Sequence, residues 1–355
     1  MLPSKTKKWR LFRAWSGRNP VWCTWQVTYR CNFRCAFCHY WKDPMGARPE
    51  QSIEQIAAGA GKLAKLGSLL TSIGGGEPFM RQDMVEIIRA VARFHFPFVT
   101  TNGWFITPEL AHDLFKAGLW GASVSIDYAD PAQHDQRRGM KGCFDRAVAA
   151  LEYLSRARRY DWQRVNLLCI LLDDNLDHIE PLIRLAAEHD AFFMIQAYGV
   201  RKTGNRRFVN TGDSIGQYLV GLKRKYRNVL SNEVFLSRFD AALDGGVPGC
   251  RAGRAFFNID SLGDVSICVE ERDRPVANLY RHPASEIVRR LRAVSRQNTC
   301  TACWYNCRGE VEMLYHPAAL FKSLPTLFFD RGRPSQMPAS GSNGPEALIG
   351  PGPPR

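Results

Sequence analysis

Two kinds of segment are missing from this sequence of 355 residues. No stretch approaches the roughly 20 consecutive apolar residues that a helix needs to cross a bilayer. The first residues, MLPSKTKKWRLFRAW, lack the continuous apolar core and the small-residue cleavage site of a secretory signal. These absences argue against a membrane-spanning or exported protein, and they predict a soluble protein of the cytoplasm.

Acidic residues are missing from the first 20 positions, although the chain as a whole has a formal net charge of +14. A second basic region runs over 201–227. Such an excess suits an acidic peptide, an anionic lipid surface or RNA, but a solvated surface has the same composition. Modules that read RNA leave basic and aromatic clusters in a domain of their own, and none is visible, so we expect no nucleic-acid partner. The basic side chains of the first segment are Lys5, Lys7, Lys8, Arg10, Arg13 and Arg18.

Three aromatic residues of this first segment, Trp9, Phe12 and Trp15, share one face of a predicted helix. Aromatic side chains among basic ones suit contact with a membrane surface. A short helix packed on the rest of the protein explains them equally well.

The middle of the chain alternates short β-like runs with helical patterns. Predicted helices begin at Ser52, a good N-cap, and place Pro108 at a first helical position. Six β/α units in succession predict an α/β fold, a partial TIM-type (β/α)6 barrel with functional residues at the C-terminal ends of its strands. The predicted strands are 21–28, 69–73, 98–101, 122–126, 165–172 and 192–197, and the helices are 52–66, 83–94, 107–117, 143–158 and 176–188.

Composition further divides the chain into segments. The tail is rich in Pro, Gly and Ser, cannot bury enough apolar surface to fold, and is predicted to be disordered. The segments are a basic N-terminus (1–20), the barrel core (21–200), a helical bridge (201–249), a small cysteine-rich domain (250–315) and the tail (330–355).

Eleven cysteines are many for a reducing compartment, where stable disulfides are disfavoured. Clustered cysteines then indicate a metal centre or catalysis. The isolated Cys23, Cys143 and Cys169 lie in apolar surroundings and are interpreted as buried side chains. The clustered ones are Cys31, Cys35 and Cys38 early in the chain and Cys250, Cys268, Cys300, Cys303 and Cys307 late in it.

The early cysteines have the spacing C-x3-C-x2-C in a loop after a predicted strand. Three thiolates can hold three irons of a [4Fe–4S] cluster and leave the fourth iron open to another ligand, whereas four cysteines are the usual set. Zinc is the alternative, with His39 as a fourth ligand, although zinc sites more often show paired C-x2-C units.

The run Cys31-Asn32-Phe33-Arg34-Cys35-Ala36-Phe37-Cys38 resembles the signature of the radical S-adenosylmethionine (SAM) superfamily, in which an aromatic residue, here Phe37, precedes the third cysteine. Gly75-Gly76-Glu77-Pro78, after the second predicted strand, resembles the GGEP motif that holds the methionyl amino group of SAM in that family. Asn102, Ser125 and Asp127 match positions that often face the ribose or carboxylate of SAM. The resemblance covers roughly 20–315. It implies a [4Fe–4S] cluster that cleaves SAM reductively to a 5′-deoxyadenosyl radical, which abstracts hydrogen from a C–H bond.

The late cysteines resemble the SPASM/twitch extension of the same superfamily, which binds one or two auxiliary [4Fe–4S] clusters. The sequence departs from the full SPASM pattern because only C-x2-C-x3-C is present in its second half and no cysteine follows Cys307. One auxiliary cluster is therefore expected, with Cys250, Cys268, Cys300 and either Cys303 or Cys307 as the favoured ligands. A structural zinc ribbon is the alternative at this site.

The resemblance implies an enzyme, and the leading hypothesis is modification of a peptide or protein substrate, with an electron donor such as flavodoxin or ferredoxin. Radical modification of a small molecule, sugar or lipid is the alternative. RNA modification and a non-catalytic metal scaffold rank below both, since a scaffold has no use for GGEP. No catalytic acid or base is assigned. Glu270, Glu271 and Asp273 can project toward a cavity, but a solvated loop is the default interpretation.

Overall fold

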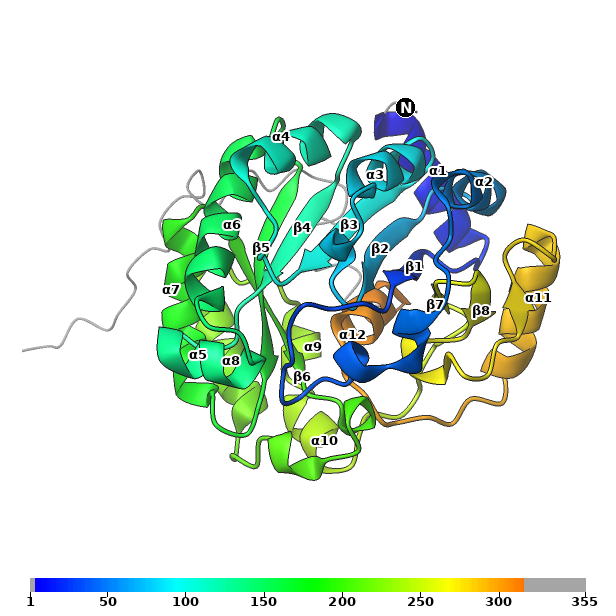
Figure 1. Cartoon of the computed structure of the whole chain (residues 1–355). Coiled ribbons are helices and arrows are strands. Elements are labelled where there is room, and N and C mark those ends of the chain that lie inside the picture. Colours follow the sequence, from blue (N-terminus) through cyan, green and yellow to red (C-terminus); the bar gives the residue numbers. More distant parts are fainter. Residues whose placement is uncertain (1–3, 316–355) are drawn as a thin grey trace, which may run out of the picture.

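The computed structural model describes residues 4–315 of the chain. Within them, nine strands form one sheet in the order β6-β5-β4-β3-β2-β1-β7-β8-β9 (Figure 1). From β1 to β6 each strand pairs in parallel with the next, which confirms the predicted α/β fold with a partial, open barrel. These strands are β1 (Trp22–Thr28), β2 (Leu70–Gly75), β3 (Phe96–Thr101), β4 (Gly121–Ser125), β5 (Arg164–Leu171) and β6 (Phe192–Ala197).

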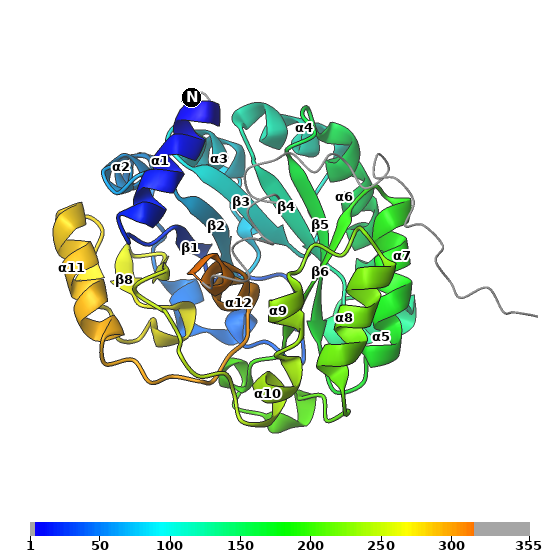
Figure 2. The same ribbon diagram turned by 180° about the vertical axis from the view of Figure 1, so that it is seen from behind.

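Helices cover the outer face of these six strands (Figures 1 and 2). Local signals fix their ends. Ser52 and Gln55 form a reciprocal capping box at the start of α2, and Gly118 ends α4 in the left-handed conformation. The helices are α2 (Ile53–Leu63), α3 (Met84–Ala92), α4 (Pro108–Ala117), α5 (Pro131–Arg138), α6 (Cys143–Ala157) and α7 (Ile179–Glu188).

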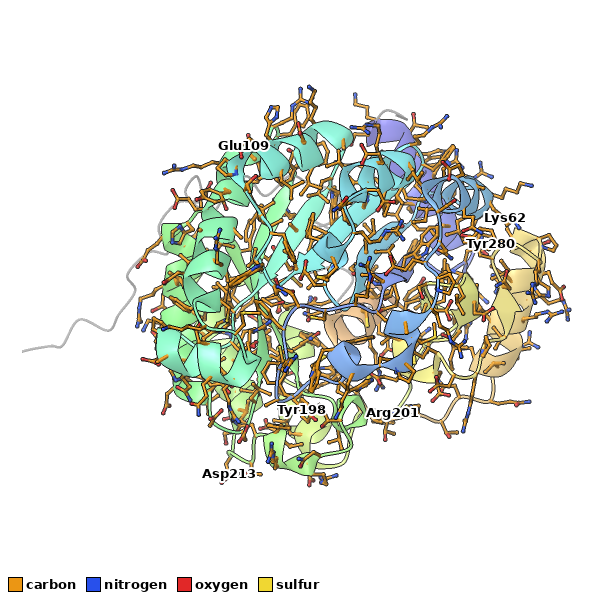
Figure 3. The ribbon with its side chains drawn as sticks, viewed as in Figure 1. Lys62, Glu109, Tyr198, Arg201, Asp213 and Tyr280 are labelled. Carbon is orange, nitrogen blue, oxygen red and sulfur yellow. The ribbon has the colours of Figure 1, made fainter. Side chains whose placement is uncertain are left out.

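The cysteine-rich C-terminal segment continues the same sheet. Strand β7 (Phe256–Ile259) pairs in parallel with β1, and β8 (Asp264–Ser266) and β9 (Ala277–Asn278) follow in antiparallel order. Lys62, at the end of α2, donates to the carbonyls of Leu279, Tyr280 and His282 and ties this segment to the barrel (Figure 3). The remaining helices are α8 (Ile215–Lys225), α9 (Glu233–Leu236), α10 (Phe239–Asp244), α11 (Ala284–Ser295) and α12 (Asn306–Glu312).

The apolar core lies between the sheet and its covering helices. Trp25 of β1 is fully buried, and its indole N–H donates to Gln51 at 2.8 Å. The isolated Cys23, Cys143 and Cys169 are fully buried, as their apolar surroundings predicted. These three thiols therefore belong to the packing of the barrel wall.

The basic N-terminus forms helix α1 (Ser4–Ser16), which packs on the barrel through an unusual contact. Lys7 is buried and donates to the carbonyls of Ala92 and His95, while Trp9 on the outer side is 61% exposed. No helix between residues 4 and 315 is long and apolar enough to cross a membrane. The tail predicted at 330–355 lies outside the described residues.

Candidate active site

The early cysteines lie in the loop that follows β1, at the C-terminal end of the barrel strands. Cys35 is buried and Cys31 and Cys38 are partly buried. The loop is held from two sides: Ala36 N donates to Arg137 O at 3.0 Å, and the Trp41 indole donates to Cys38 O at 2.9 Å. Three thiols are thus presented together by one rigid loop.

The environment of these thiols fits a cationic group between them. Burial raises the pKa of Cys31 to about 11 and raises that of Cys35 as well. Each of the two pKa values is raised further by the neighbouring cysteine sulfurs. Without a metal the buried thiols are therefore protonated, and iron would supply the positive charge that stabilises them as thiolates.

The ligand set does not favour zinc. His39, which would have been the fourth ligand, lies against Arg272 at 3.2 Å and stacks on Tyr40. Between residues 4 and 315, no three Cys, His, Asp or Glu side chains converge closely enough to hold a single metal ion. With His39 engaged by Arg272 and Tyr40, these cysteines lack the fourth ligand that a zinc site would need from it.

The GGEP turn at the end of β2 is built around the start of the cysteine loop. Gly75 has φ +140°, and Gly76 N and Glu77 N donate to Thr28 O and Arg30 O at 3.0 and 2.8 Å. A Cβ on Gly75 would lie 1.8 Å from Thr28 O, so only glycine allows this approach. Pro78 then begins a short 3₁₀ turn.

Glu77 of this turn acts as a connector between strand ends. Its buried carboxylate accepts hydrogen bonds from Thr101 Oγ1 and Asn102 N, both at 2.7 Å. Burial raises the pKa of Glu77 to about 7. The Asn102 side chain in turn donates to Asn32 Oδ1 in the cysteine loop at 2.9 Å. Cysteine loop, GGEP turn and Asn102 therefore form one hydrogen-bonded unit.

The remaining residues predicted to contact SAM lie on either side of this unit. Ser125 ends β4 and is half-buried. Asp127 is fully buried, and its carboxylate accepts from Arg138 at 2.6 Å and from Ile170 N at 2.9 Å. The guanidinium of Arg138 also lies over the Phe37 ring, at 5.7 Å. Asp127 thus orients Arg138 beneath the cysteine loop, and both of its oxygens are engaged by the protein.

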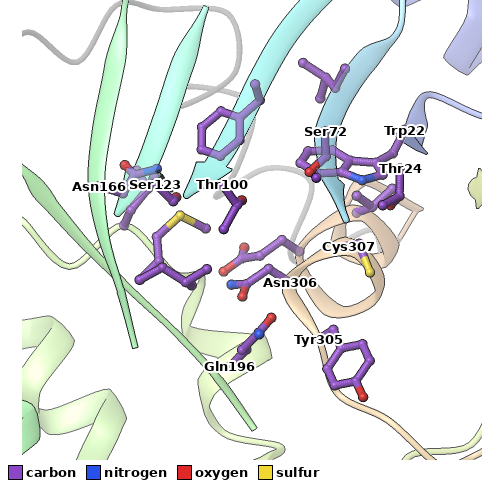
Figure 4. Close-up of a pocket in the computed structure, with 18 of the residues that line it drawn as sticks. Trp22, Thr24, Ser72, Thr100, Ser123, Asn166, Gln196, Tyr305, Asn306 and Cys307 are labelled. Carbon is purple, nitrogen blue, oxygen red and sulfur yellow. Dashed lines mark hydrogen bonds between the residues drawn. The ribbon is translucent and has the colours of Figure 1, made fainter. Parts of the chain in front are cut away.

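A cavity of ≈ 560 Å³ occupies the interior of the barrel (Figure 4). Its lining includes Gly74 and Gly75, at the start of the GGEP turn, and also Cys307, one of the late cysteines. The barrel strands contribute uncharged hydrogen-bonding side chains to its wall. These are Thr24, Gln26, Ser72, Thr100, Ser123, Asn166 and Gln196, joined by Asn306 from α12. They lie on the inward face of the strands, where the period-2 pattern of each strand places them. Single hydroxyl and amide residues form no motif, so nothing in the sequence marks them as cavity residues.

The late cysteines share a second, smaller cavity. All five of them line it, together with Tyr305 and Arg308. Asn298 donates to Cys250 O at 3.2 Å and accepts from Cys300 N at 3.1 Å, which links the two cysteine-bearing segments. Burial raises the pKa values of Cys268 and Cys303 to about 12. The donor set and its burial suit an iron–sulfur cluster here also.

Lys202 connects the two cysteine sites. Its ammonium lies 4.6 Å from the ring centre of Tyr40, two residues after Cys38, and 5.7 Å from that of Tyr305, two residues before Cys307. The same ammonium is 3.5 Å from Glu270, which accepts from the Tyr305 hydroxyl at 3.0 Å. Lys202 and both tyrosines also line the barrel cavity. Glu270 therefore faces the cavity side of these contacts and not only solvent. Lys202 was not predicted from the sequence, because a single lysine belongs to no motif.

A parallel half-barrel with three cysteines beyond its first strand and a GGEP turn beyond its second defines the class of iron–sulfur enzymes that cleave SAM. The chain belongs to the radical SAM superfamily, whose family description matches residues 25–186. Over 312 residues it is 30% identical to mycofactocin maturase MftC of Mycolicibacterium smegmatis, covering 82% of this chain and 77% of that one. It is also 34% identical to an AdoMet-dependent heme synthase of Methanosarcina barkeri, over 50% of this chain and 51% of the other.

Solved structures share the fold at low sequence identity. Streptococcus suis SuiB bound to precursor peptide SuiA has a TM-score of 0.62 at 16% identity, and the match covers 76% of this chain and 64% of SuiB. The chain thus spans less than two thirds of SuiB. The enzyme anSMEcpe, with bound AdoMet and the Cp18Cys peptide, has a TM-score of 0.57 at 17% identity. The match covers 76% of this chain and 80% of anSMEcpe.

Membership settles two expectations from the sequence. The protein is a radical SAM enzyme with a [4Fe–4S] cluster and SAM as cofactors. Its cysteine-rich C-terminal region is of the SPASM/twitch type.

Proposed function

We propose that this enzyme modifies a peptide or protein substrate by hydrogen abstraction inside the barrel cavity. The observation that carries the proposal is the single cavity that reaches the GGEP turn at one end and Cys307 at the other. When bound, a [4Fe–4S] cluster and SAM would supply the 5′-deoxyadenosyl radical at this site. The names of the maturase MftC and of the SuiB and anSMEcpe complexes with peptides support a substrate of this class.

The chemistry of the cavity wall suits a peptide segment. Most of the polar side chains that its strands contribute are hydroxyls and amides, with Arg164 as the charged exception. The Asn306 side-chain oxygen is buried without a donor among residues 4–315, while its nitrogen donates to Ile195 O. A peptide backbone carries both N–H and C=O groups and can satisfy such a wall, whereas a hydrocarbon chain would leave it unpaired.

We propose the following roles at the radical site. Cys31, Cys35 and Cys38 hold three irons, and Phe37 packs against Arg138 below them. The backbone of Gly75 and Gly76, with Glu77 and Pro78 fixing the turn, binds the methionyl amino group of SAM. Asn102 and Ser125 face the nucleoside or carboxylate part of SAM. Asp127 positions Arg138, whose cation then lies close to Cys35.

For the auxiliary cluster we propose Cys250, Cys268, Cys303 and Cys307 as the four ligands. Burial raises the pKa of Cys307, and the neighbouring sulfurs of Cys303, Cys268 and Cys250 raise it further, so these four sulfurs lie near one another. Cys300, a favoured ligand from the sequence, lines the same cavity but is the spare thiol in this proposal, which therefore departs from that expectation. Cys300→Ser should then keep the full iron content after anaerobic reconstitution, while Cys307→Ser should lose one cluster by iron assay and EPR. The reverse result would make Cys300 a ligand.

Two partners complete the proposal. A one-electron carrier such as flavodoxin or ferredoxin supplies the electron for SAM cleavage. The exposed Trp9 and the half-exposed Phe12, stacked 5.6 Å apart on a basic helix that buries Lys7, support contact with an anionic membrane surface. Trp9→Ala/Phe12→Ala should then weaken co-sedimentation with anionic vesicles without changing SAM cleavage, and unchanged binding would contradict the contact.

The substrate proposal is tested with short peptides encoded beside the gene. The reconstituted enzyme, SAM and a reductant are incubated with each peptide, and products are read by tandem mass spectrometry. A SAM-dependent mass change within one peptide, absent from a Cys31→Ala/Cys35→Ala/Cys38→Ala variant, is the expected result. Modification of a small molecule, sugar or lipid from the same cells, with every peptide unchanged, would replace the peptide hypothesis.

A further inference from the structure

A cavity lined by arginines lies where the C-terminal end of α1 meets α11, far from the cysteine loop in the fold. Figure 2 shows these two helices at the same edge of the molecule. The cavity has a volume of ≈ 270 Å³, and its lining residues are Gly17, Arg18, Arg254, Arg292, Ser295 and Arg296. Four arginines from three separate segments of the chain therefore line one hollow at the surface, and no acidic residue belongs to its wall.

Hydrogen bonds and well-defined backbone conformations hold the segments that form this hollow in place. The Arg292 guanidinium donates to Arg18 O and Asn19 Oδ1, both at 3.0 Å, and so joins α11 to the end of α1. Arg18 has φ +57°, a left-handed conformation that is costly for any residue with a Cβ. Arg254 follows the tight turn at Gly253, which has φ +78°. The backbone of each segment is thus fixed while it presents its arginine.

These four arginines differ from their neighbours in how their charge is balanced. On the adjacent turn of α11, Arg289 and Arg290 both pair with Glu286, at 2.6 and 2.7 Å. None of the four cavity arginines has a carboxylate partner among residues 4–315. Like charges held together repel one another, and a bound anion relieves that repulsion.

We propose that this cavity binds a phosphate group. The planar guanidinium fork matches phosphate oxygens in pairs, and a doubly charged phosphate monoester suits several arginines better than a single carboxylate does. A second hollow of ≈ 320 Å³ shares Arg292 and Arg296 and adjoins the first, so a ligand larger than phosphate itself has room. The phosphate comes either from a lipid headgroup, which Trp9 and Phe12 on α1 would favour, or from a soluble phosphate compound.

The proposal is tested on the reconstituted enzyme with two probes. Isothermal titration measures binding of inorganic phosphate, and co-sedimentation measures binding to phosphatidylcholine vesicles with and without phosphatidic acid. The variant is Arg254→Gln/Arg296→Gln. The control is Arg206→Gln/Arg207→Gln, which removes the same charge from two exposed arginines elsewhere. Formation of 5′-deoxyadenosine checks that both variants remain folded and active, independently of the phosphate site.

The cavity variant should bind roughly tenfold or more weakly than wild type to at least one probe, and the control should match wild type. Loss confined to phosphatidic acid vesicles identifies a lipid headgroup, and loss confined to inorganic phosphate identifies a soluble compound. Equal weakening in both variants would reduce the effect to general charge and overturn the proposal. Failure of the wild-type protein to bind either probe would overturn it too.

Discussion

Alanine substitution along Gly74-Gly75-Gly76 tests whether the GGEP turn is shaped by its contact with the cysteine loop. The three positions differ in the space around them. A Cβ on Gly75 would lie 1.8 Å from Thr28 O, and one on Gly76 would lie 2.1 Å from Arg30 O. A Cβ on Gly74 would meet nothing within 4 Å. The same substitution, glycine to alanine, should therefore be damaging at Gly75 and Gly76, and Gly74→Ala is the matched control.

The cost follows from which atoms collide. Both clashes are with backbone carbonyls, so β1 and the start of the cysteine loop must shift. Overpacking of this kind costs about 1–3 kcal/mol, and the two hydrogen bonds that join the turn to this segment are worth about 1 kcal/mol each. Gly75→Ala and Gly76→Ala should each lower the free energy of unfolding by roughly 3–5 kcal/mol. Gly74→Ala should stay within about 1 kcal/mol of wild type.

The assay combines anaerobic denaturant unfolding with iron content after reconstitution. Gly75→Ala and Gly76→Ala should retain less iron because the cysteine loop moves with the clash. Gly74→Ala should retain full iron but bind SAM or substrate more weakly, since Gly74 lines the barrel cavity. Wild-type stability and iron content in Gly75→Ala or Gly76→Ala would refute the reasoning, as would equal damage from Gly74→Ala.

Two further predictions concern charged groups beside the cavity. Burial raises the pKa of Glu310 to about 7, above its ordinary 4.5, so folding favours its neutral form and ionisation costs stability as pH rises from 4.5 to 7. Relative to wild type, the free energy of unfolding of Glu310→Gln should therefore rise across that window by up to about 3 kcal/mol, and by less if water enters the cavity. Denaturant unfolding of both proteins at pH 5 and pH 8 measures this, and a difference that is the same at both pH values would contradict it. Lys202→Met should lower stability by about 3 kcal/mol, because the largely buried Glu270 loses the cation 3.5 Å from its carboxylate and keeps only the weaker influence of Arg201. Lys202→Met/Glu270→Gln should recover part of the loss in a double-mutant cycle. Strict additivity of the two substitutions would show that the pair is not coupled.

Much of the barrel was predictable because its strands and helices carry strong periodic patterns. The six predicted strands correspond to β1 through β6, and Ser52 and Pro108 begin helices as predicted. The cysteine loop and GGEP turn were found because their residue types are rare in combination. Their spatial contact follows from the parallel order of β1 and β2, whose C-terminal ends meet.

Other features left too little trace in the sequence. Helix α5 was missed because PAQHDQRR has no apolar periodicity, although Asp130 caps it and Gly139 ends it. Strands β7, β8 and β9 are too short for a period to show. The engagement of Asp127 by Arg138 depends on a buried ion pair, which spacing alone does not reveal.

The most direct test of radical SAM chemistry in this protein is formation of 5′-deoxyadenosine. The wild-type protein and the Cys31→Ala/Cys35→Ala/Cys38→Ala variant are reconstituted with iron and sulfide, reduced, given SAM, and analysed by mass spectrometry under anaerobic conditions. We expect 5′-deoxyadenosine from the wild type and none from the variant. The claim of radical SAM chemistry would be contradicted if a fully iron-loaded, reduced wild-type protein formed no 5′-deoxyadenosine, either alone or with cell extract added as a source of substrate.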